Sequence, residues 1–146
     1  MIYPAPTNKL DPALARGVLA ANVPASTKEA AHIVVTFINT NYEMHLVPTT
    51  PISTPIGKRL IGTITLQAKR IDTVGTGGQY IEPVYGRPRR VQGTVLRTEK
   101  NALVIDAGVP IHATLTDARQ TLDQFQPGQF VSFDAVAGAT FTPAAS

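Results

Sequence analysis

The chain has 146 residues, a net charge of +3 and no cysteine. This fits one domain and excludes a disulfide framework, a thiolate metal site and a cysteine nucleophile. Charged residues make up 16% of the sequence, and no apolar run approaches the roughly 20 residues of a membrane helix. We therefore expect a sheet-rich cytoplasmic protein with no membrane partner.

Residues 1–29 are predicted to form an N-terminal arm with one short helix. Asp11 is a suitable N-cap, and Pro12 suits the first helical position. The Ala- and Leu-containing stretch 12–21 would form the helix, which Asn22 and Pro24 would end.

Residues 30–85 read as strands. A β-branched run at 33–38 and an alternating run at 42–47 predict a hairpin, and three prolines at 48–57 predict a loop. A long strand is expected over 58–72, with the even-numbered residues from Leu60 to Arg70 on one face. Residues 79–85 would return as a strand that breaks near Pro83.

The rest of the chain predicts four more strands, a short helix and a flexible tail. The strands are expected at 91–97, 102–107, 110–115 and 130–136. Thr116 and Asp117 would cap the helix, which would end near Gln124. Residues 138–146 are expected to be loose.

The predicted fold is therefore all-β: a small antiparallel OB-like barrel with an N-terminal helical arm and a short helix before the last strand. The barrel domain would span 30–137. Residues 30–85 either belong to the same barrel or extend it as a separate hairpin or sheet beside a core at 91–137.

The barrel prediction is strengthened by a resemblance. Gly-Thr-Val-Leu-Arg at 93–97, Ala-Leu-Val-Ile-Asp-Ala-Gly at 102–108, Ile-His at 111–112 and Phe-Gln-Pro-Gly-Gln-Phe-Val at 125–131 resemble, in order and spacing, an S1-type RNA-binding OB domain. His112 matches the histidine usual in that family. Leu103 stands where family members that bind RNA usually carry an aromatic residue, so the resemblance implies the barrel more than it implies RNA binding.

Positive charge is concentrated in residues 58–100, which hold nine Lys or Arg against three acidic residues. Guanidinium groups bind phosphates and tyrosines stack on bases, so this segment predicts binding of single-stranded nucleic acid. The alternative is a solvated edge whose charges prevent aggregation. The candidate nucleic-acid-binding residues are Lys58, Arg59, Lys69, Arg70, Tyr80, Tyr85, Arg87, Arg89, Arg90, Arg97 and His112.

No catalytic set is recognisable in the sequence. Glu43 and His45 share a strand face but lack a third ligand, and the glycine-rich run at 75–78 lacks the Lys-Ser/Thr of a phosphate-binding loop. We therefore expect no enzyme, no cofactor and no metal.

Two further functions stay open. A structural or assembly protein would form homo-oligomers through its N-terminal arm and β-edges, with its basic middle meeting its acidic C-terminal part. An enzyme with a site invisible in the sequence is the third alternative.

Overall fold

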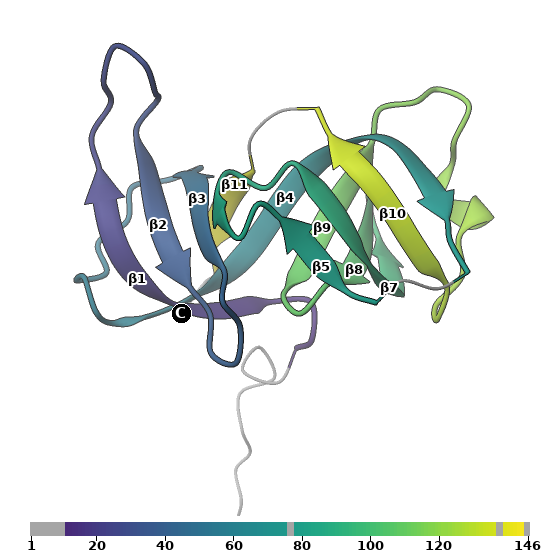
Figure 1. Ribbon diagram of the computed structural model, residues 1–146, viewed down its shortest axis with the longest axis horizontal. Helices are drawn as coiled ribbons and strands as arrows, with labels where there is room; N and C mark the ends of the chain where they lie inside the picture. Colours follow the sequence, from purple (N-terminus) through teal and green to yellow (C-terminus); the bar gives the residue numbers. More distant parts are fainter. Residues whose placement is uncertain (1–10, 76–77, 137–138, 145–146) are drawn as a thin grey trace, which may run out of the picture.

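The computed structural model describes residues 11–75, 78–136 and 139–144, and within these ranges it contains strands and one 3-10 turn but no α-helix (Figure 1). The all-β prediction is confirmed. The elements are β1 (Ala15–Val23), β2 (His32–Thr36), β3 (Glu43–Pro48), β4 (Arg59–Thr73), β5 (Tyr80–Glu82), β6 (Tyr85–Gly86), β7 (Arg90–Glu99), β8 (Ala102–Asp106), β9 (Pro110–Leu115), η1 (Leu122–Gln124), β10 (Phe130–Ala135) and β11 (Thr140–Pro143).

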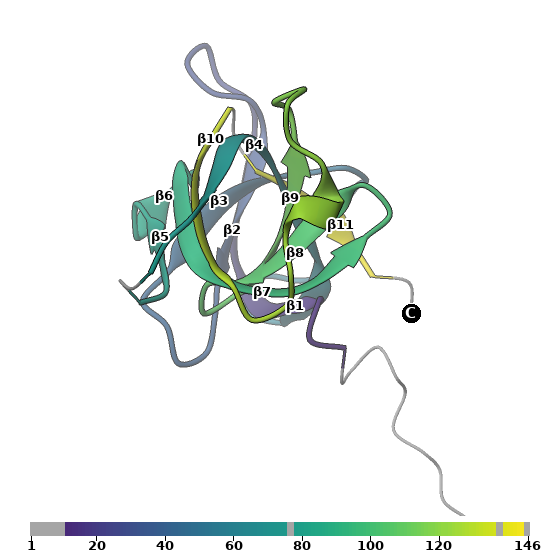
Figure 2. The same cartoon turned by 90° about the vertical axis from the view of Figure 1, so that its right-hand side faces the viewer.

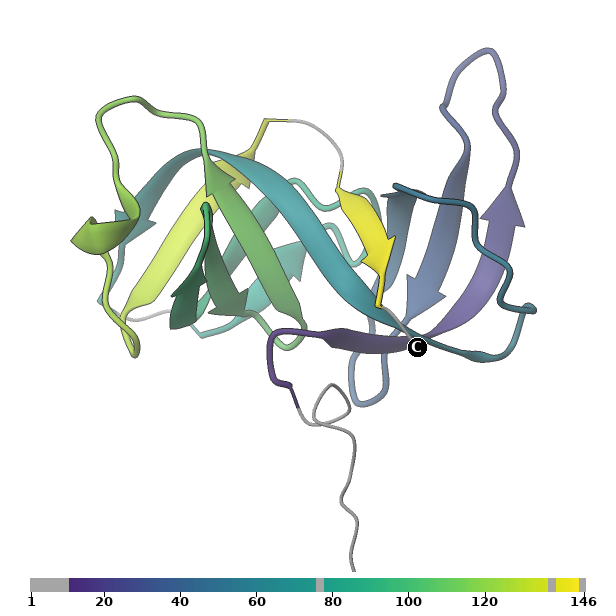
Figure 3. The same ribbon diagram turned by 180° about the vertical axis from the view of Figure 1, so that it is seen from behind.

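The strands pair into two closed rings that share β4. The N-terminal ring runs β1–β2–β3–β11–β4 and returns to β1, and the C-terminal ring runs β4–β10–β7–β8–β9 and returns to β4. Figure 2 looks into the C-terminal ring, and Figure 3 shows β4 passing from one ring to the other.

Both rings have the same pairing pattern. Each contains three consecutive antiparallel strands, β1–β2–β3 or β7–β8–β9. The third strand then pairs in parallel with a fourth, which is β11 beside β3 and β4 beside β9. An antiparallel strand, β4 or β10, closes each ring. The shared strand β4 is therefore the closing antiparallel strand of the N-terminal ring and the parallel fourth strand of the C-terminal ring.

The predicted N-terminal helix is wrong, because residues 15–23 form β1. Ala15, Gly17 and Leu19 are buried in alternation, as in a strand with one face on a core. A Cβ on Gly17 would lie 2.6 Å from the backbone oxygen of Thr36, so β1 packs directly on β2. Burial of this face overrides the weak helical preference of the Ala-rich sequence.

The predicted helix before the last long strand is also wrong, because this connection contains a single 3-10 turn that starts after Thr121 rather than after Thr116 and Asp117. The Thr116 hydroxyl instead donates to the carbonyl of Ala68. The side-chain amide of Gln120 makes two hydrogen bonds with the backbone of Ile71. Residues 116–120 thus continue the edge contacts of β4 beyond the end of β9.

The tail predicted to be loose contains β11. Ala139 and Phe141 are 0% and 1% exposed, and β11 is hydrogen-bonded to both β3 and β4. β11 closes the N-terminal ring, so Phe141 completes a core that is otherwise formed by strands far from β11 in the sequence.

A bulge in β4 changes which residues face inward. Alternate residues from Leu60 to Ala68 are buried, as predicted, but the next buried residue is Ile71. Opposite this point the register with β10 shifts, since Phe133 pairs with Ile71 and Ala135 with Ala68. The bulge leaves residues 69 and 70 both exposed. The prediction that Arg70 shares a face with Leu60 is therefore wrong.

One apolar cluster fills both rings, and Tyr42 links them at their junction. Its hydroxyl donates to the carbonyl of Ala107 at 3.1 Å and accepts from the backbone N–H of Ile81 at 3.0 Å. Partial burial raises the pKa of Tyr42, while the bond from Ile81 opposes the rise. The phenol is therefore held in its neutral, hydrogen-bonded form.

Candidate nucleic-acid interface

A recess of about 620 Å³ lies on the outside of the C-terminal ring, and it contains three of the predicted basic residues. We call it the β4–β7 groove. It is lined by Lys69, Glu82, Pro83, Val84, Arg89, Arg90, Asp134 and Ala135.

The sheet brings these side chains together from distant parts of the sequence. Lys69 reaches the groove from the bulge of β4, and Arg89 and Arg90 reach it from the start of β7. Arg90 pairs in register with Glu82 of β5 on one side and with Asp134 of β10 on the other. The two carboxylates therefore flank the guanidinium-bearing strand.

A hydrogen-bonded chain fixes Arg90. Its Nη1 lies 3.0 Å from Asp134 Oδ1, and its Nε donates to the hydroxyl of Tyr80 at 3.4 Å. That hydroxyl donates to Gln92 Oε1 at 3.2 Å, and Gln92 Nε2 donates to the carbonyl of Gly78 at 3.0 Å. Tyr80 first and Asp134 second raise the pKa of Arg90, so its positive charge is permanent.

Two other cations of the groove are not neutralised. Across residues 11–75, 78–136 and 139–144, neither the Lys69 amine nor the Arg89 guanidinium makes a hydrogen bond or ion pair, and both residues are exposed. The Glu82 carboxylate is likewise exposed and without such a contact to any described residue. These three groups are available to a ligand.

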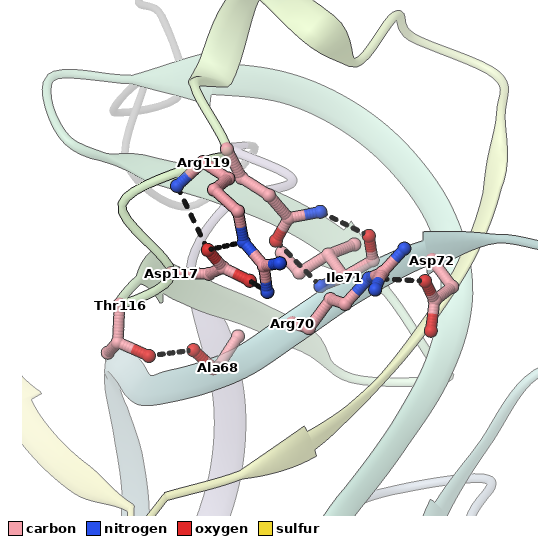
Figure 4. A network of polar contacts seen from close by, with 8 residues as sticks. Ala68, Arg70, Ile71, Asp72, Thr116, Asp117 and Arg119 are labelled. Atoms are coloured by element: carbon pink, nitrogen blue, oxygen red, sulfur yellow. Dashed lines mark hydrogen bonds and ion pairs between the residues drawn. The ribbon is translucent and has the colours of Figure 1, made fainter.

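Arg70 lines a second recess, which lies between β4 and the connection from β9 to β10; Figure 4 shows the polar contacts there. Arg70 Nε is 3.1 Å from Asp72 Oδ1. Arg119 binds Asp117 through two nitrogens, at 3.1 and 3.0 Å, and these bonds lower the pKa of Asp117 to about 2. Each arginine here already has a carboxylate partner.

Other predicted basic residues lie away from the groove. Arg59 is ten positions from Lys69 on β4, which corresponds to about 33 Å along an extended strand, and Lys58 precedes it. Arg97 binds Asp11 at 3.1 Å and Glu99 at 2.8 Å.

The remaining candidates lie apart as well. Arg87 lines a small pocket that also contains His32 and His45, and Tyr85 is exposed on β6. His112 is 8% exposed, and its Nε2 donates to the carbonyl of Ala13 at 2.8 Å. The ring of His112 is buried against the backbone at Ala13, so it does not line the groove.

Sequence reasoning missed the two carboxylates of the groove and the Arg119–Asp117 pair. Glu82 stood among basic residues in the sequence, but its place beside Arg90 depends on the pairing of β5 with β7. Arg119 lies two residues from Asp117, a spacing that gave no signal for a bidentate pair.

The described residues contain no group of three or more His, Asp or Glu side chains placed to hold a metal ion. His32 and His45 stack with ring centroids 4.8 Å apart, and His32 Nδ1 is 3.0 Å from the carbonyl of Ala30. In the same part of the chain no helix is long and apolar enough to cross a membrane.

Comparison with known proteins does not assign the chain to a family. No protein-family model, no curated protein and no solved structure shows significant similarity to it.

Proposed function

We propose that this protein is a non-catalytic module that binds single-stranded nucleic acid, DNA or RNA, in the β4–β7 groove. The observation that carries the proposal is the convergence of Lys69, Arg89 and Arg90 on one recess from two strands about 20 positions apart in sequence. Two of these cations have no partner among the described residues, and an ammonium and a guanidinium are the usual protein ligands of phosphate.

The groove also offers surface for bases. Pro83, Val84 and Ala135 supply apolar lining, and Tyr80, which does not line the groove, contacts the groove residue Arg90 through its hydroxyl. Single-strand binding sites combine a basic groove for the backbone with aromatic side chains on which the bases stack, and Tyr80 is the aromatic residue nearest to this role. A duplex would leave such surface unused, because its bases are already stacked.

We further propose that the C-terminal ring is an OB-like barrel with a rearranged strand order. The S1 resemblance accounts for β7, β8, β9, the 3-10 connection and β10 in sequence order. An OB barrel has five strands. The strand β4 fills the fifth place, between β9 and β10, although it precedes them in the chain.

The proposal is tested by fluorescence anisotropy with a labelled oligothymidylate at 50 and 200 mM salt. Two phosphate contacts on a single strand, from Lys69 and Arg89, which are unpaired among the described residues, give a salt slope of about −1.4, so the affinity should fall roughly sevenfold over this range. In the variant Lys69→Gln/Arg89→Gln both of these contacts are lost, and the affinity should change by less than about twofold over the same range.

A matched control is the variant Lys58→Gln/Arg59→Gln, which removes the same charge from the opposite end of β4. It should keep most of the wild-type salt slope. Absence of binding at 50 mM salt would remove the proposal, and equal losses in both double variants would show that net charge, not the groove, drives binding.

The alternative of assembly through β-edges has less support. Among the described residues, each of the strands from β1 to β4 and from β7 to β11 pairs with other strands on both sides. The short strands β5 and β6 pair on one side. Light scattering distinguishes the alternatives: a stable oligomer that binds no oligonucleotide would favour assembly.

A further inference from the structure

We propose that Glu82 makes the β4–β7 groove selective for guanine; this inference rests on the proposed binding of single strands. A carboxylate in a phosphate-binding groove needs an explanation because it repels the nucleic-acid backbone. The second carboxylate of the groove, Asp134, is bound to Arg90, whereas Glu82 has no such partner among the described residues.

The position of Glu82 suits contact with a base. It ends β5 and is followed directly by Pro83 and Val84, which line the apolar part of the same groove. Its backbone is fixed, since it pairs with Arg90 in the sheet and its carbonyl accepts from the N–H of Arg89 at 2.8 Å. A base lying on the apolar lining would present its edge to this carboxylate.

Hydrogen-bond chemistry selects the base. An ionised carboxylate accepts hydrogen bonds through two oxygens and donates none. Guanine has two adjacent donors on its Watson–Crick edge, N1–H and the N2 amine, which match these two oxygens. Thymine and uracil have one donor there, N3–H, and it lies between two carbonyl oxygens that a carboxylate repels.

The groove would therefore make two kinds of contact, one with phosphates and one with a base. Lys69 and Arg89 hold the phosphates, which carry no sequence information, and Glu82 contacts one base edge. A bidentate contact of this kind discriminates between bases by about tenfold or more.

The test compares three labelled oligonucleotides on the full chain: oligothymidylate, an alternating guanine–thymine oligomer, and the same oligomer with inosine for guanosine. Inosine lacks the N2 amine. We expect the guanine oligomer to bind about tenfold more tightly than oligothymidylate, with the inosine oligomer in between. In Glu82→Gln, which has one acceptor and one donor, the preference should fall to about twofold or less.

Glu99→Gln is the matched control, because it makes the same change at an exposed carboxylate that binds Arg97 outside the groove. It should keep the guanine preference. Equal binding of all three oligonucleotides would overturn the inference and leave the proposed function intact. Equal tightening of all three by Glu82→Gln would also overturn it, since Glu82 would then only repel phosphate. Failure of every oligonucleotide to bind would remove both proposals.

Discussion

Truncation of Phe141 measures how far the C-terminal strand supports the fold. Phe141 is 1% exposed, and its ring lies over the backbone of β4, since a Cβ on Gly62 would be 2.5 Å from its Cζ. Removal of a buried Phe side chain costs about 3–5 kcal/mol. With an unfolding entropy near 2.1 cal/mol/K per residue, the 146-residue chain should lose about 10–16 °C in Tm.

The assay is thermal and urea unfolding of Phe141→Ala, followed by circular dichroism. Thr142→Ala is the control, because Thr142 is the next residue of β11 and its side chain is exposed. The control should change stability by less than about 1 kcal/mol. If both variants lose the same small amount, β11 does not belong to the core and the closure of the N-terminal ring is refuted.

Two further predictions concern the connection from β9 to β10. Gln120→Ala removes the two hydrogen bonds to the backbone of Ile71, so it should lower the free energy of unfolding by about 1–3 kcal/mol, measured by urea unfolding. Gln126→Ala is the control, because Gln126 is exposed; it should lower the free energy of unfolding by less than about 0.5 kcal/mol. Asp117 has a pKa lowered from 3.8 to about 2, so the stability that it contributes is present above pH 3.8 and is lost as the pH falls through 2. The difference in Tm between wild type and Asp117→Asn should therefore shrink from pH 5 to pH 2, and a difference that stays constant would contradict the role of its ion pair with Arg119.

Much of the local structure was predictable because strands leave a period of two in the sequence. The hairpin of β2 and β3, the long strand β4 and the strands β7 to β10 all lie close to the predicted positions. These segments are rich in β-branched and aromatic residues, and turn residues or prolines separate them. The break at Pro83 between β5 and β6 was likewise predictable from the residue itself.

Two of the errors fall where a segment has a weak pattern of its own. Residues 15–23 and 140–143 are rich in Ala or Thr, and their apolar positions become core positions only when β4 lies beside them. Arg70 turned outward because of a bulge, which arises from the pairing of β4 with β10.

The sequence by itself determined that the chain is all-β, where most strands lie and that its positive charge gathers in residues 58–100. Only the tertiary structure decided which of those charges meet. Lys69 and Arg89 share a groove, Arg59 lies at the far end of β4, and His112 is buried. The physical reason is that strand period gives the direction of a side chain only along a regular strand, whereas its neighbours, and the bulge that turned Arg70 outward, follow from the pairing of distant strands.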